Sequence, residues 1–356
     1  MQYIFTAERI VLVQPLAVHF SIKKQSTMIG ILGSGSWPTA IVKILLENPK
    51  AKLAWWVREP EIIEGLIANH HNTFYLSEAE IDATRITISS NIREIIELAD
   101  DILVVIPSAF VHAALKDIPA ELLQTKNFHC ATKGLVPETN QILTDYLHDT
   151  YGVPLENMTV VSGPSHAEEA AMERLTYLTV ASLNEPLASR MRQALECKYV
   201  KTTFSTDIQG IEYSTVMKNI YAVATGICHG LGYGDNLIAV MIANAVEEGR
   251  KFVHECEPDN TRDLTKFVYL GDLLVTCYSQ HSRNRTFGQL IGHGYTVRAA
   301  QLEMNMVAEG YFGVKGVEQL RRSLNVQMPI QQAVYKILYE RANARRTMKT
   351  LLENLQ

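Results

Sequence analysis

The first half of the chain alternates short apolar runs with longer segments in which apolar residues recur at helical spacing. Beginning at Met28, it contains the apolar runs MIGILG, KLAWWV, DILVVIPS, FHCATKG, MTVVSGPS, LTYLTVAS and KYVKTTFST, which are typical of buried strands. The segments TAIVKILLEN and PEIIEGLIANH each follow one of the first two runs and have helical periodicity. Alternating strands and helices predict an α/β domain over residues 28–210, built on a parallel sheet with helices on both faces.

The pattern changes after about Asp207. The later segments STVMKNIYAVATGICHGLGYGDN, NLIAVMIANAVEEGRKFVHE and PIQQAVYKILYERANARRTMKTLLENL all have helical periodicity, and no clear strand lies among them. We therefore predict an all-helical C-terminal domain over residues 211–356. No low-complexity linker separates the two halves and no internal repeat is evident, so we expect two closely packed domains.

Composition narrows the class of protein. The chain has 356 residues, of which 47% are hydrophobic, enough for two domains with substantial cores. A net charge of -5 argues against a general nucleic-acid binder, which needs a basic stripe, but allows a local basic pocket. The five cysteines are scattered rather than spaced as a disulfide framework, which favours the cytoplasm. No apolar run approaches the roughly 20 residues of a membrane-spanning helix.

The first 27 residues stand apart from this pattern. Their apolar run IVLVQPLAVHFSI is interrupted by Gln14, Pro15 and His19, and no small-residue cleavage site follows it. It is a weak candidate for a signal peptide. We interpret residues 1–27 as a dispensable N-terminal extension because the first clear strand begins at Met28. The sequence does not assign this extension a role.

A glycine-containing loop, GSGSW, lies between the first predicted strand and the first predicted helix. In this context Gly33 permits a tight turn and Gly35 lets the backbone approach a pyrophosphate, while Ser36 and Trp37 open a helix whose N-terminus favours an anion. Pro38 replaces the third glycine of a dinucleotide-binding fingerprint. Proline is tolerated in the first turn of a helix, so the loop still predicts a Rossmann-like dinucleotide site.

The end of the second predicted strand bears on the choice of cofactor. An acidic residue there suits the ribose hydroxyls of NAD, whereas an arginine suits the 2'-phosphate of NADP. Arg58 favours NADP and the adjacent Glu59 leaves NAD possible. The sequence therefore predicts NADP(H) as the favoured cofactor without excluding NAD(H).

Several pieces together resemble the bacterial NAD(P)-dependent glycerol-3-phosphate dehydrogenases. They occur in the family's order from Met28 to the C-terminus and comprise GSGSW, WWVRE, VVIPS, ATKGL, VSGPSHAEE, VMKNIYAVATGICHGLGYGDN, LGDLLVTC, SRNRTFG, VAEGY and MPIQQAVYKIL. The resemblance implies a Rossmann-like N-terminal domain and a helical C-terminal domain. It also implies reversible reduction of dihydroxyacetone phosphate to sn-glycerol 3-phosphate, which feeds phospholipid synthesis.

The resemblance assigns the residues nearest the chemistry. Lys218, in VMKN, matches the catalytic lysine, which exchanges a proton with the substrate oxygen; spacing alone would suggest an ordinary solvated lysine. Asp272 matches a substrate-site acid that pairs with Lys218 and tunes its proton affinity. Lys133, in ATKGL, matches a lysine that binds both substrate and cofactor. Asn219 is expected to support the site by hydrogen bonding.

The remaining site residues are also carried over from the resemblance. Arg283 offers a planar fork to the substrate phosphate and also approaches the cofactor, with Ser282 and Asn284 as further substrate ligands. The other matched substrate contacts are Gly163 and Ser165, and the other matched cofactor contacts are Ala167, Val307 and Glu309. Relatives often carry an aromatic residue and a lysine around this alanine, where this chain has His166 and Glu168.

Two other functions and the question of assembly stay open on the sequence. A dehydrogenase acting on a hydroxy acid shares the loop and the lysine but needs no SRNR segment, and a non-enzymatic dinucleotide sensor would be expected to lose Lys218 or Asp272. Dependence of the rate on the substrate phosphate distinguishes the hydroxy-acid dehydrogenase from the family's reaction.

The histidines show no H-x-x-x-H spacing, so no metal is expected. A homodimer is implied by the resemblance only.

Overall fold

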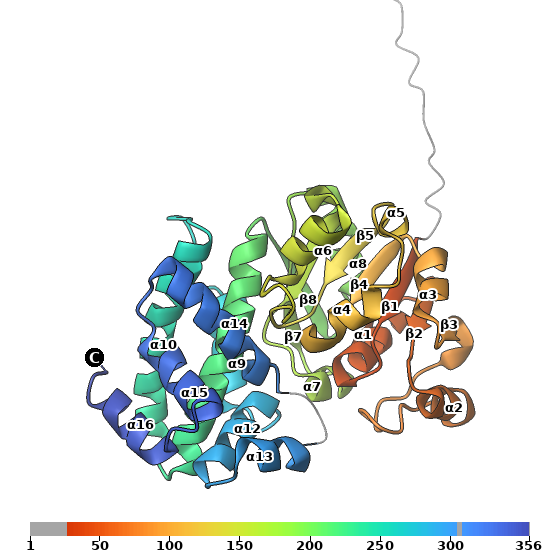
Figure 1. Ribbon diagram of the computed structural model, residues 1–356. Coiled ribbons are helices and arrows are strands. Elements are labelled where there is room, and N and C mark those ends of the chain that lie inside the picture. The colour runs from red at the N-terminus through yellow and green to blue at the C-terminus, as the bar shows by residue number, and fades with distance from the viewer. Residues whose placement is uncertain (1–26, 305–307, 356) are drawn as a thin grey trace, which may run out of the picture.

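The computed structural model describes residues 27–304 and 308–355. Its N-terminal half is built on an eight-stranded sheet in the order β3-β2-β1-β4-β5-β6-β7-β8, flanked by helices (Figure 1). The strands are β1 (Met28–Leu32), β2 (Lys52–Trp56), β3 (Ile86–Ser89), β4 (Asp101–Val104), β5 (Asn127–Cys130), β6 (Met158–Ser162), β7 (Thr176–Ala181) and β8 (Val200–Ser205). The predicted N-terminal extension, apart from Thr27, lies outside the described residues.

The predicted parallel sheet is confirmed, with one antiparallel pair of strands that the sequence did not predict. Every neighbouring pair is parallel except β6 and β7, which are antiparallel. The only helix between them is α7 (Ala167–Ala171), which packs beside α1 (Ser36–Leu46) through a 2.6 Å bond from Lys43 Nζ to the Ala171 carbonyl. A parallel return needs a longer crossover, so the chain turns at this edge and β7 runs back.

Helices cover both faces of the sheet and form the whole C-terminal half. The sheet half contains α1, α2 (Pro60–Asn69), α3 (Ile92–Leu98), α4 (Ser108–Leu115), α5 (Ala120–Leu123), α6 (Leu143–Tyr151), α7 and α8 (Glu185–Leu195), with 3-10 turns at Ala83–Arg85 and Leu155–Asn157. The C-terminal half contains α9 (Ile208–Gly230), α10 (Asp235–Cys256), α11 (Asp272–Tyr278), α12 (Arg283–Gly292), α13 (Val297–Glu303), α14 (Glu309–Leu324), α15 (Pro329–Tyr339) and α16 (Ala344–Leu352), with a π-helical turn at Phe267–Gly271. Apolar side chains form a core on each face of the sheet and a third core among these helices.

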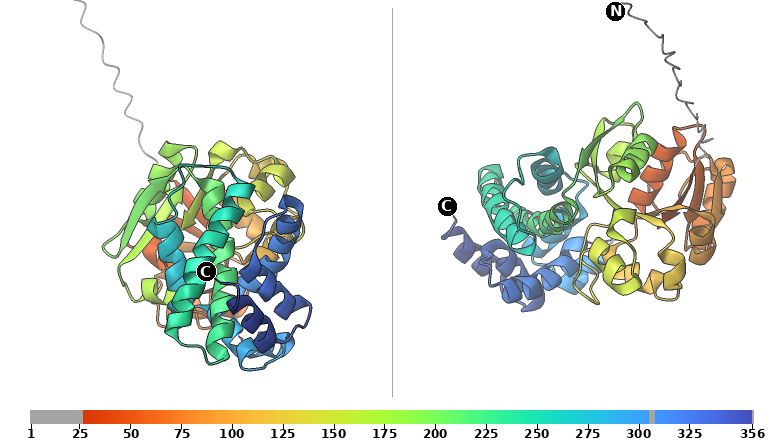
Figure 2. Two further views of the ribbon diagram at one scale, coloured as in Figure 1. Left: turned by 90° about the vertical axis from the view of Figure 1, so that its left-hand side faces the viewer. Right: turned by 90° about the horizontal axis from the view of Figure 1, so that it is seen from above.

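The long helix α9 runs through the centre of the helical half, and the other helices pack around it (Figures 1 and 2). Its closest neighbour is α12, and glycines make this contact possible. A Cβ on Gly226 of α9 would overlap the Arg285 carbonyl, and a Cβ on Gly288 of α12 would overlap the Val223 carbonyl. This close approach sets the N-terminus of α12 beside the middle of α9, where Lys218 lies.

A buried carboxyl group links α9 to the sheet half. Glu212 lies on α9, is 5% exposed, and accepts hydrogen bonds from the Leu143 backbone N–H at 3.2 Å and from the Thr144 hydroxyl. It therefore satisfies N–H and O–H groups at the first turn of α6, where helices lack internal acceptors. Burial raises the pKa of Glu212 from 4.5 to about 8, with the nearby Asp145 carboxylate adding to the effect.

Replacing Glu212 should change how the free energy of unfolding depends on pH. Folding raises the pKa of Glu212, so its contribution to stability is fully present below about pH 4.5 and is lost as the pH rises toward 8. Glu212→Gln should flatten the pH dependence of the unfolding free energy between these limits. Glu212→Ala should lower that free energy by about 2–3 kcal/mol because the Leu143 N–H loses its acceptor. Urea unfolding from pH 5 to 8 measures both effects, and equal slopes for wild type and Glu212→Gln would contradict this assignment.

Candidate active site

A cleft of about 650 Å³ lies between the carboxyl edge of the sheet and the helical half. Its walls come from the glycine loop after β1, the segments after β2, β4 and β5, and helices α9, α12 and α14. The strand order reverses between β1 and β4, and ligands of open α/β sheets bind where the order reverses. A volume in this range suits a small-molecule ligand or cofactor.

The glycine loop is held open by bonds from neighbouring elements. Gly33 has φ +128°, and a Cβ there would stand 2.8 Å from the Val105 carbonyl, so only glycine fits. The buried indole of Trp55 donates to the Gly33 carbonyl at 2.6 Å. Asn72, fully buried, donates to the Ser34 carbonyl at 2.8 Å and so fixes the next residue of the loop.

The loop and the start of α1 fit a dinucleotide despite Pro38. A Cβ on Gly35 would meet only the Pro38 ring at 4.0 Å, so the space above its backbone is open to a ligand. The helix begins at Ser36, which places Pro38 in the first turn, as predicted, where its missing N–H removes no helical bond. Trp37 lines the same cleft, and its buried indole N–H has no protein acceptor among the described residues.

The Arg58 and Glu59 side chains both line the cleft at the end of β2. Glu59 accepts a 2.6 Å bond from the Ser34 hydroxyl and pairs with Arg58 at 2.6 Å. Burial alone would raise the pKa of Glu59, but these two partners outweigh it and hold the pKa below its usual value of 4.5. A carboxylate therefore stands beside the glycine loop and is paired with Arg58, whose side chain is 68% exposed.

Lys218 and Asp272 form an ion pair inside the cleft. Both side chains are almost completely buried, at 5% and 3% exposed, and the Lys218 ammonium contacts the Asp272 carboxylate directly. Lys218 comes from α9, and Asp272 begins α11 immediately after the π-helical turn. The Thr276 hydroxyl, which also lines the cleft, is bonded to the Asp272 carbonyl at 2.6 Å. A buried pair of this kind survives only because each charge satisfies the other.

Lys133 enters the cleft from the segment after β5. Its ammonium lies 5.5 Å from the centre of the Trp37 ring, which is a cation–π distance. Burial, and after it the neighbouring Lys218 ammonium, lower the pKa of Lys133 to about 7. Lys133 is therefore a cation whose charge is lost near neutral pH.

A chain of hydrogen bonds fixes these groups relative to one another. Asn219 donates to the Lys133 carbonyl at 2.8 Å and accepts from the Asn284 amide at 2.9 Å, and Asn284 in turn accepts from the Gly310 N–H at 2.8 Å. Glu309 accepts from the Ser108 N–H at 2.9 Å and from its hydroxyl at 2.6 Å. These bonds connect α9, α12 and α14 with the loops of the sheet half.

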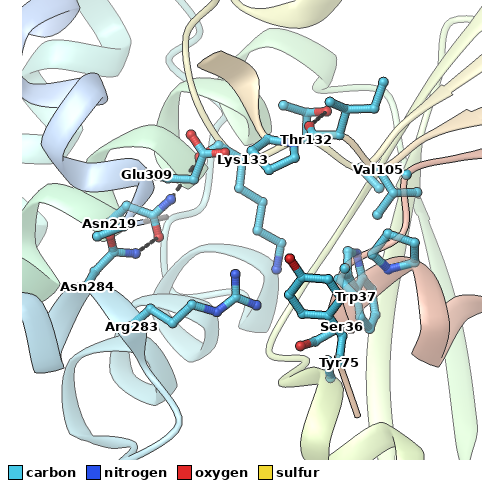
Figure 3. A pocket seen from close by; sticks show the side chains of 18 of the residues that line it. Ser36, Trp37, Tyr75, Val105, Thr132, Lys133, Asn219, Arg283, Asn284 and Glu309 are labelled. Atoms are coloured by element: carbon cyan, nitrogen blue, oxygen red, sulfur yellow. Dashed lines mark hydrogen bonds between the residues drawn. The ribbon is translucent and has the colours of Figure 1, made fainter. Parts of the chain in front are cut away.

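Arg283 begins α12 and extends into the cleft toward Lys133 (Figure 3). Ser282 caps the same helix by accepting from the Arg285 N–H at 3.3 Å. The cleft therefore brings together the cations Lys133, Lys218 and Arg283, with the carboxylates of Asp272 and Glu309 also among its lining residues. Lys218 is paired with Asp272, which leaves Arg283 and Lys133 to meet an anionic ligand.

The structure brings together most of the residues that the sequence proposed. The cleft is lined by Gly33, Gly35, Ser36, Trp37, Arg58, Lys133, Ser165, Ala167, Lys218, Asp272, Ser282, Arg283, Asn284 and Glu309. Gly163 is not among the lining residues; its φ of +144° and its approach to the Tyr177 carbonyl turn the chain so that Ser165 faces the cleft. Val307 lies outside the described residues.

Sequence reasoning did not find other residues that line the cleft. They include Tyr75, Phe110, Thr132, Thr276 and His281. Tyr75 and Phe110 belong to no glycine-rich or charged motif, so only the fold reveals them. Thr276 lies four residues after Asp272 on α11, and helical spacing from that residue could have suggested it.

Two further findings concern metals and membranes. The described side chains bring together no group of three or more His, Cys, Asp or Glu residues that could hold a metal ion. No helix in the described part of the chain is both long and apolar enough to cross a membrane.

A dinucleotide loop at the switch point of the sheet, facing a buried lysine–carboxylate pair, is the arrangement of a two-domain NAD(P)-dependent dehydrogenase. The chain matches the family models for the N-terminus (residues 28–188) and C-terminus (residues 207–349) of NAD-dependent glycerol-3-phosphate dehydrogenase. It therefore belongs to this family and is an NAD(P)-dependent oxidoreductase.

Individual relatives agree with this placement. A glycerol-3-phosphate dehydrogenase [NAD(P)+] of Staphylococcus carnosus is 33% identical over 326 residues, covering 91% of this chain and 97% of the relative. One from Streptococcus agalactiae is 34% identical over 327 residues, covering 92% and 96%. The crystal structure of glycerol-3-phosphate dehydrogenase from Coxiella burnetii has a TM-score of 0.85 at 29% identity, covering 92% of this chain and 99% of that chain.

Proposed function

We propose that the chain catalyses the reversible NAD(P)H-dependent reduction of dihydroxyacetone phosphate to sn-glycerol 3-phosphate, the precursor of glycerophospholipids. The observation that carries the proposal is the buried Lys218–Asp272 pair, which shares one cleft with the glycine loop and Arg283. Together these groups provide a proton donor, a cofactor site and an anion site.

This geometry and the family resemblance support the following roles for the residues. The bound nicotinamide supplies a hydride equivalent to the substrate carbonyl carbon. Lys218 gives a proton to the carbonyl oxygen as negative charge develops on it, and Asp272 holds the ammonium in place. Lys133 donates to a substrate oxygen, and Asn219 fixes the backbone of Lys133. Arg283, Ser282 and Asn284 hold the phosphate.

The remaining groups at the cleft hold the cofactor. Gly33, Gly35, Ser36 and Trp37 receive the pyrophosphate at the start of α1. Arg58 and Glu59 meet the adenosine ribose. Lys133, Ala167, Arg283 and Glu309 complete the cofactor site, and Ser165, oriented by the turn at Gly163, completes the substrate site. The family resemblance alone adds Val307 to the cofactor contacts and Gly163 to the substrate contacts.

We also propose the division of labour within the chain, its assembly and its location. Residues 28–210 form the dinucleotide-binding domain and residues 211–356 the helical domain that supplies Lys218, Asp272 and Arg283, with the boundary placed between the last strand, which ends at Ser205, and α9, which begins at Ile208. The family resemblance supports a homodimer, which light scattering of the purified protein tests. All five cysteines are unpaired thiols, which supports a cytoplasmic location.

The direct test is oxidation of NADPH with dihydroxyacetone phosphate, followed by absorbance, with NADH and with unphosphorylated dihydroxyacetone alongside. Turnover is expected with the phosphorylated substrate and a much lower rate without the phosphate. Cofactor binding without turnover would favour a dinucleotide sensor. Better turnover with a 2-hydroxy acid than with sn-glycerol 3-phosphate in the oxidative direction would favour the hydroxy-acid dehydrogenase.

Replacing Arg58 should change the cofactor preference. Arg58→Gln removes the cation suited to a 2'-phosphate and leaves Glu59 bonded to Ser34, so the ratio of kcat/KM for NADPH to that for NADH should fall roughly tenfold. Glu59→Gln should raise the same ratio because the carboxylate no longer repels a phosphate. Steady-state kinetics with both cofactors measure the ratios. An unchanged ratio in both variants would place the choice of cofactor elsewhere.

The low pKa of Lys133 predicts that kcat/KM for dihydroxyacetone phosphate depends on pH. Burial and Lys218 bring this pKa to about 7, and the charged form binds the anionic substrate better. The kcat/KM for dihydroxyacetone phosphate should therefore fall severalfold between pH 7 and 9. In Lys133→Arg, whose guanidinium keeps its charge, this decline should disappear even if the absolute rate is lower. The same decline in Lys133→Arg would show that another group titrates.

A further inference from the structure

The π-helical turn at Phe267–Gly271 ends directly before Asp272. Such turns are uncommon and occur frequently at functional sites. Here the register of the turn decides where the carboxylate of Asp272 points, and that carboxylate is the partner of Lys218. The contacts that hold the turn in place therefore also influence the position of Asp272 relative to Lys218.

A second ionic contact holds this turn against the start of α9. The Tyr269 hydroxyl donates to Asp207 Oδ2 at 2.5 Å, and Arg262 donates to both carboxylate oxygens, at 2.6 Å from Nε and 2.9 Å from Nη2. Asp207 also caps α9 by accepting from the Gly210 N–H at 3.1 Å. Arg262 is bonded in addition to the Glu257 carbonyl at 2.8 Å. One carboxylate thus joins the π turn, the segment before it and the N-terminus of α9.

This group is buried and closely fitted. The side chain of Arg262 is 5% exposed, that of Asp207 is 16% exposed, and Tyr269 is 8% exposed. A Cβ on Gly210 would overlap the Asp207 carboxylate and the Arg262 guanidinium, so glycine leaves the room that the contact needs. None of Asp207, Arg262 and Tyr269 is among the residues that line the cleft.

The π turn and α9 are therefore joined at two places, by the Tyr269–Asp207 bond and by the Asp272–Lys218 ion pair. Tyr269 precedes Asp272 by three residues, and Asp207 precedes Lys218 by eleven, or about 16 Å along a helix. We propose that Asp207, Arg262 and Tyr269 are positioning residues that fix the π turn on α9 and thereby hold Asp272 against Lys218. The proposal rests on the function proposed above for the Lys218–Asp272 pair. It assigns catalytic consequences to three residues that contact neither substrate nor cofactor.

Tyr269→Phe tests the proposal by removing only the hydroxyl. The matched control is Tyr151→Phe, because Tyr151 is 7% exposed, belongs to the same apolar core and also loses a bonded hydroxyl, which faces Tyr146. In the reduction of dihydroxyacetone phosphate, Tyr269→Phe should lower kcat about tenfold and leave KM within twofold. Tyr151→Phe should leave both unchanged. A kcat for Tyr269→Phe equal to that of the control would overturn the proposal.

A double-mutant cycle separates positioning from a general loss of stability. If Tyr269 acts through Asp272, Tyr269→Phe should have no further effect on kcat in an Asp272→Asn background. Equal losses in both backgrounds would overturn the proposal. Arg262→Lys, which keeps the charge, should retain more of kcat than Arg262→Gln; equal retention would contradict the ionic contact.

The same cycle can be read without turnover. Tm is measured for wild type, Tyr269→Phe, Asp272→Asn and the double variant, and the Tm shifts are expected to be non-additive. Additive shifts would overturn the proposal even if the chain acts on another substrate. Absence of dihydroxyacetone phosphate turnover in the wild type, with non-additive shifts, would instead contradict the proposed function alone.

Discussion

Lys218→Met is expected to lower kcat for dihydroxyacetone phosphate reduction by roughly 10³- to 10⁴-fold, with little change in NADPH affinity. General acid catalysis by a positioned side chain contributes rate enhancements of about this size. Methionine keeps the length of the side chain and suits a helix, so α9 should persist. Lys218 comes from α9, whereas the glycine loop lies between β1 and α1, so cofactor binding, measured by fluorescence titration, should survive.

The control for this variant must address the fold as well as the chemistry. Removing Lys218 leaves Asp272 as a buried charge without its partner, which can cost about 3–5 kcal/mol of stability. The double variant Lys218→Met/Asp272→Asn removes both charges and should recover stability without recovering turnover. Lys336→Met, at an exposed position on α15, should behave as wild type. Turnover within tenfold of wild type in a folded Lys218→Met protein would rule out Lys218 as the proton donor.

The sequence predicts the sheet half well because a buried strand can be recognised from its own run of apolar residues. Apolar runs such as DILVV need no knowledge of distant residues, and β4 forms where that run lies. The short β3 escaped prediction because its residues are only partly buried and make no apolar run. The sequence did not predict the direction of β7. Whether β7 runs parallel or antiparallel to β6 depends on where α7 packs, and that packing is a tertiary contact.

The site could be predicted only where a motif or the family resemblance pointed to it. The spacing of Lys218 on its helix cannot show that the residue is buried, since burial follows from Asp272, which is 54 residues away in the chain and reaches Lys218 through the π turn. In the same way, Arg58 and Glu59 suggested a choice of cofactor, but the bond from Ser34 to Glu59 depends on how the loop lies over β2.

Arg283→Met is expected to lower kcat/KM for dihydroxyacetone phosphate by roughly 30- to 1,000-fold, mainly through KM. The guanidinium extends into a cleft in which Lys133 and Lys218 are assigned to the carbonyl end of the substrate in the proposed mechanism, and Arg58 is assigned to the cofactor. Loss of a charge-assisted contact to phosphate of this kind costs about 2–4 kcal/mol. Activity toward unphosphorylated dihydroxyacetone should fall much less, and only through the cofactor contact of Arg283, because that substrate has no phosphate for Arg283 to bind.

The ratio of the two substrates makes this prediction specific to the phosphate. A general disturbance of α12 would lower both activities together, whereas loss of the phosphate contact lowers mainly the activity toward dihydroxyacetone phosphate. Arg285→Met provides the matched control, since Arg285 lies on the same helix and does not line the cleft. Arg283→Lys should fall between wild type and Arg283→Met, because it keeps the charge without the planar fork. A preserved preference for the phosphorylated substrate in Arg283→Met would move the phosphate to Lys133, whose charge near neutral pH would then control its binding.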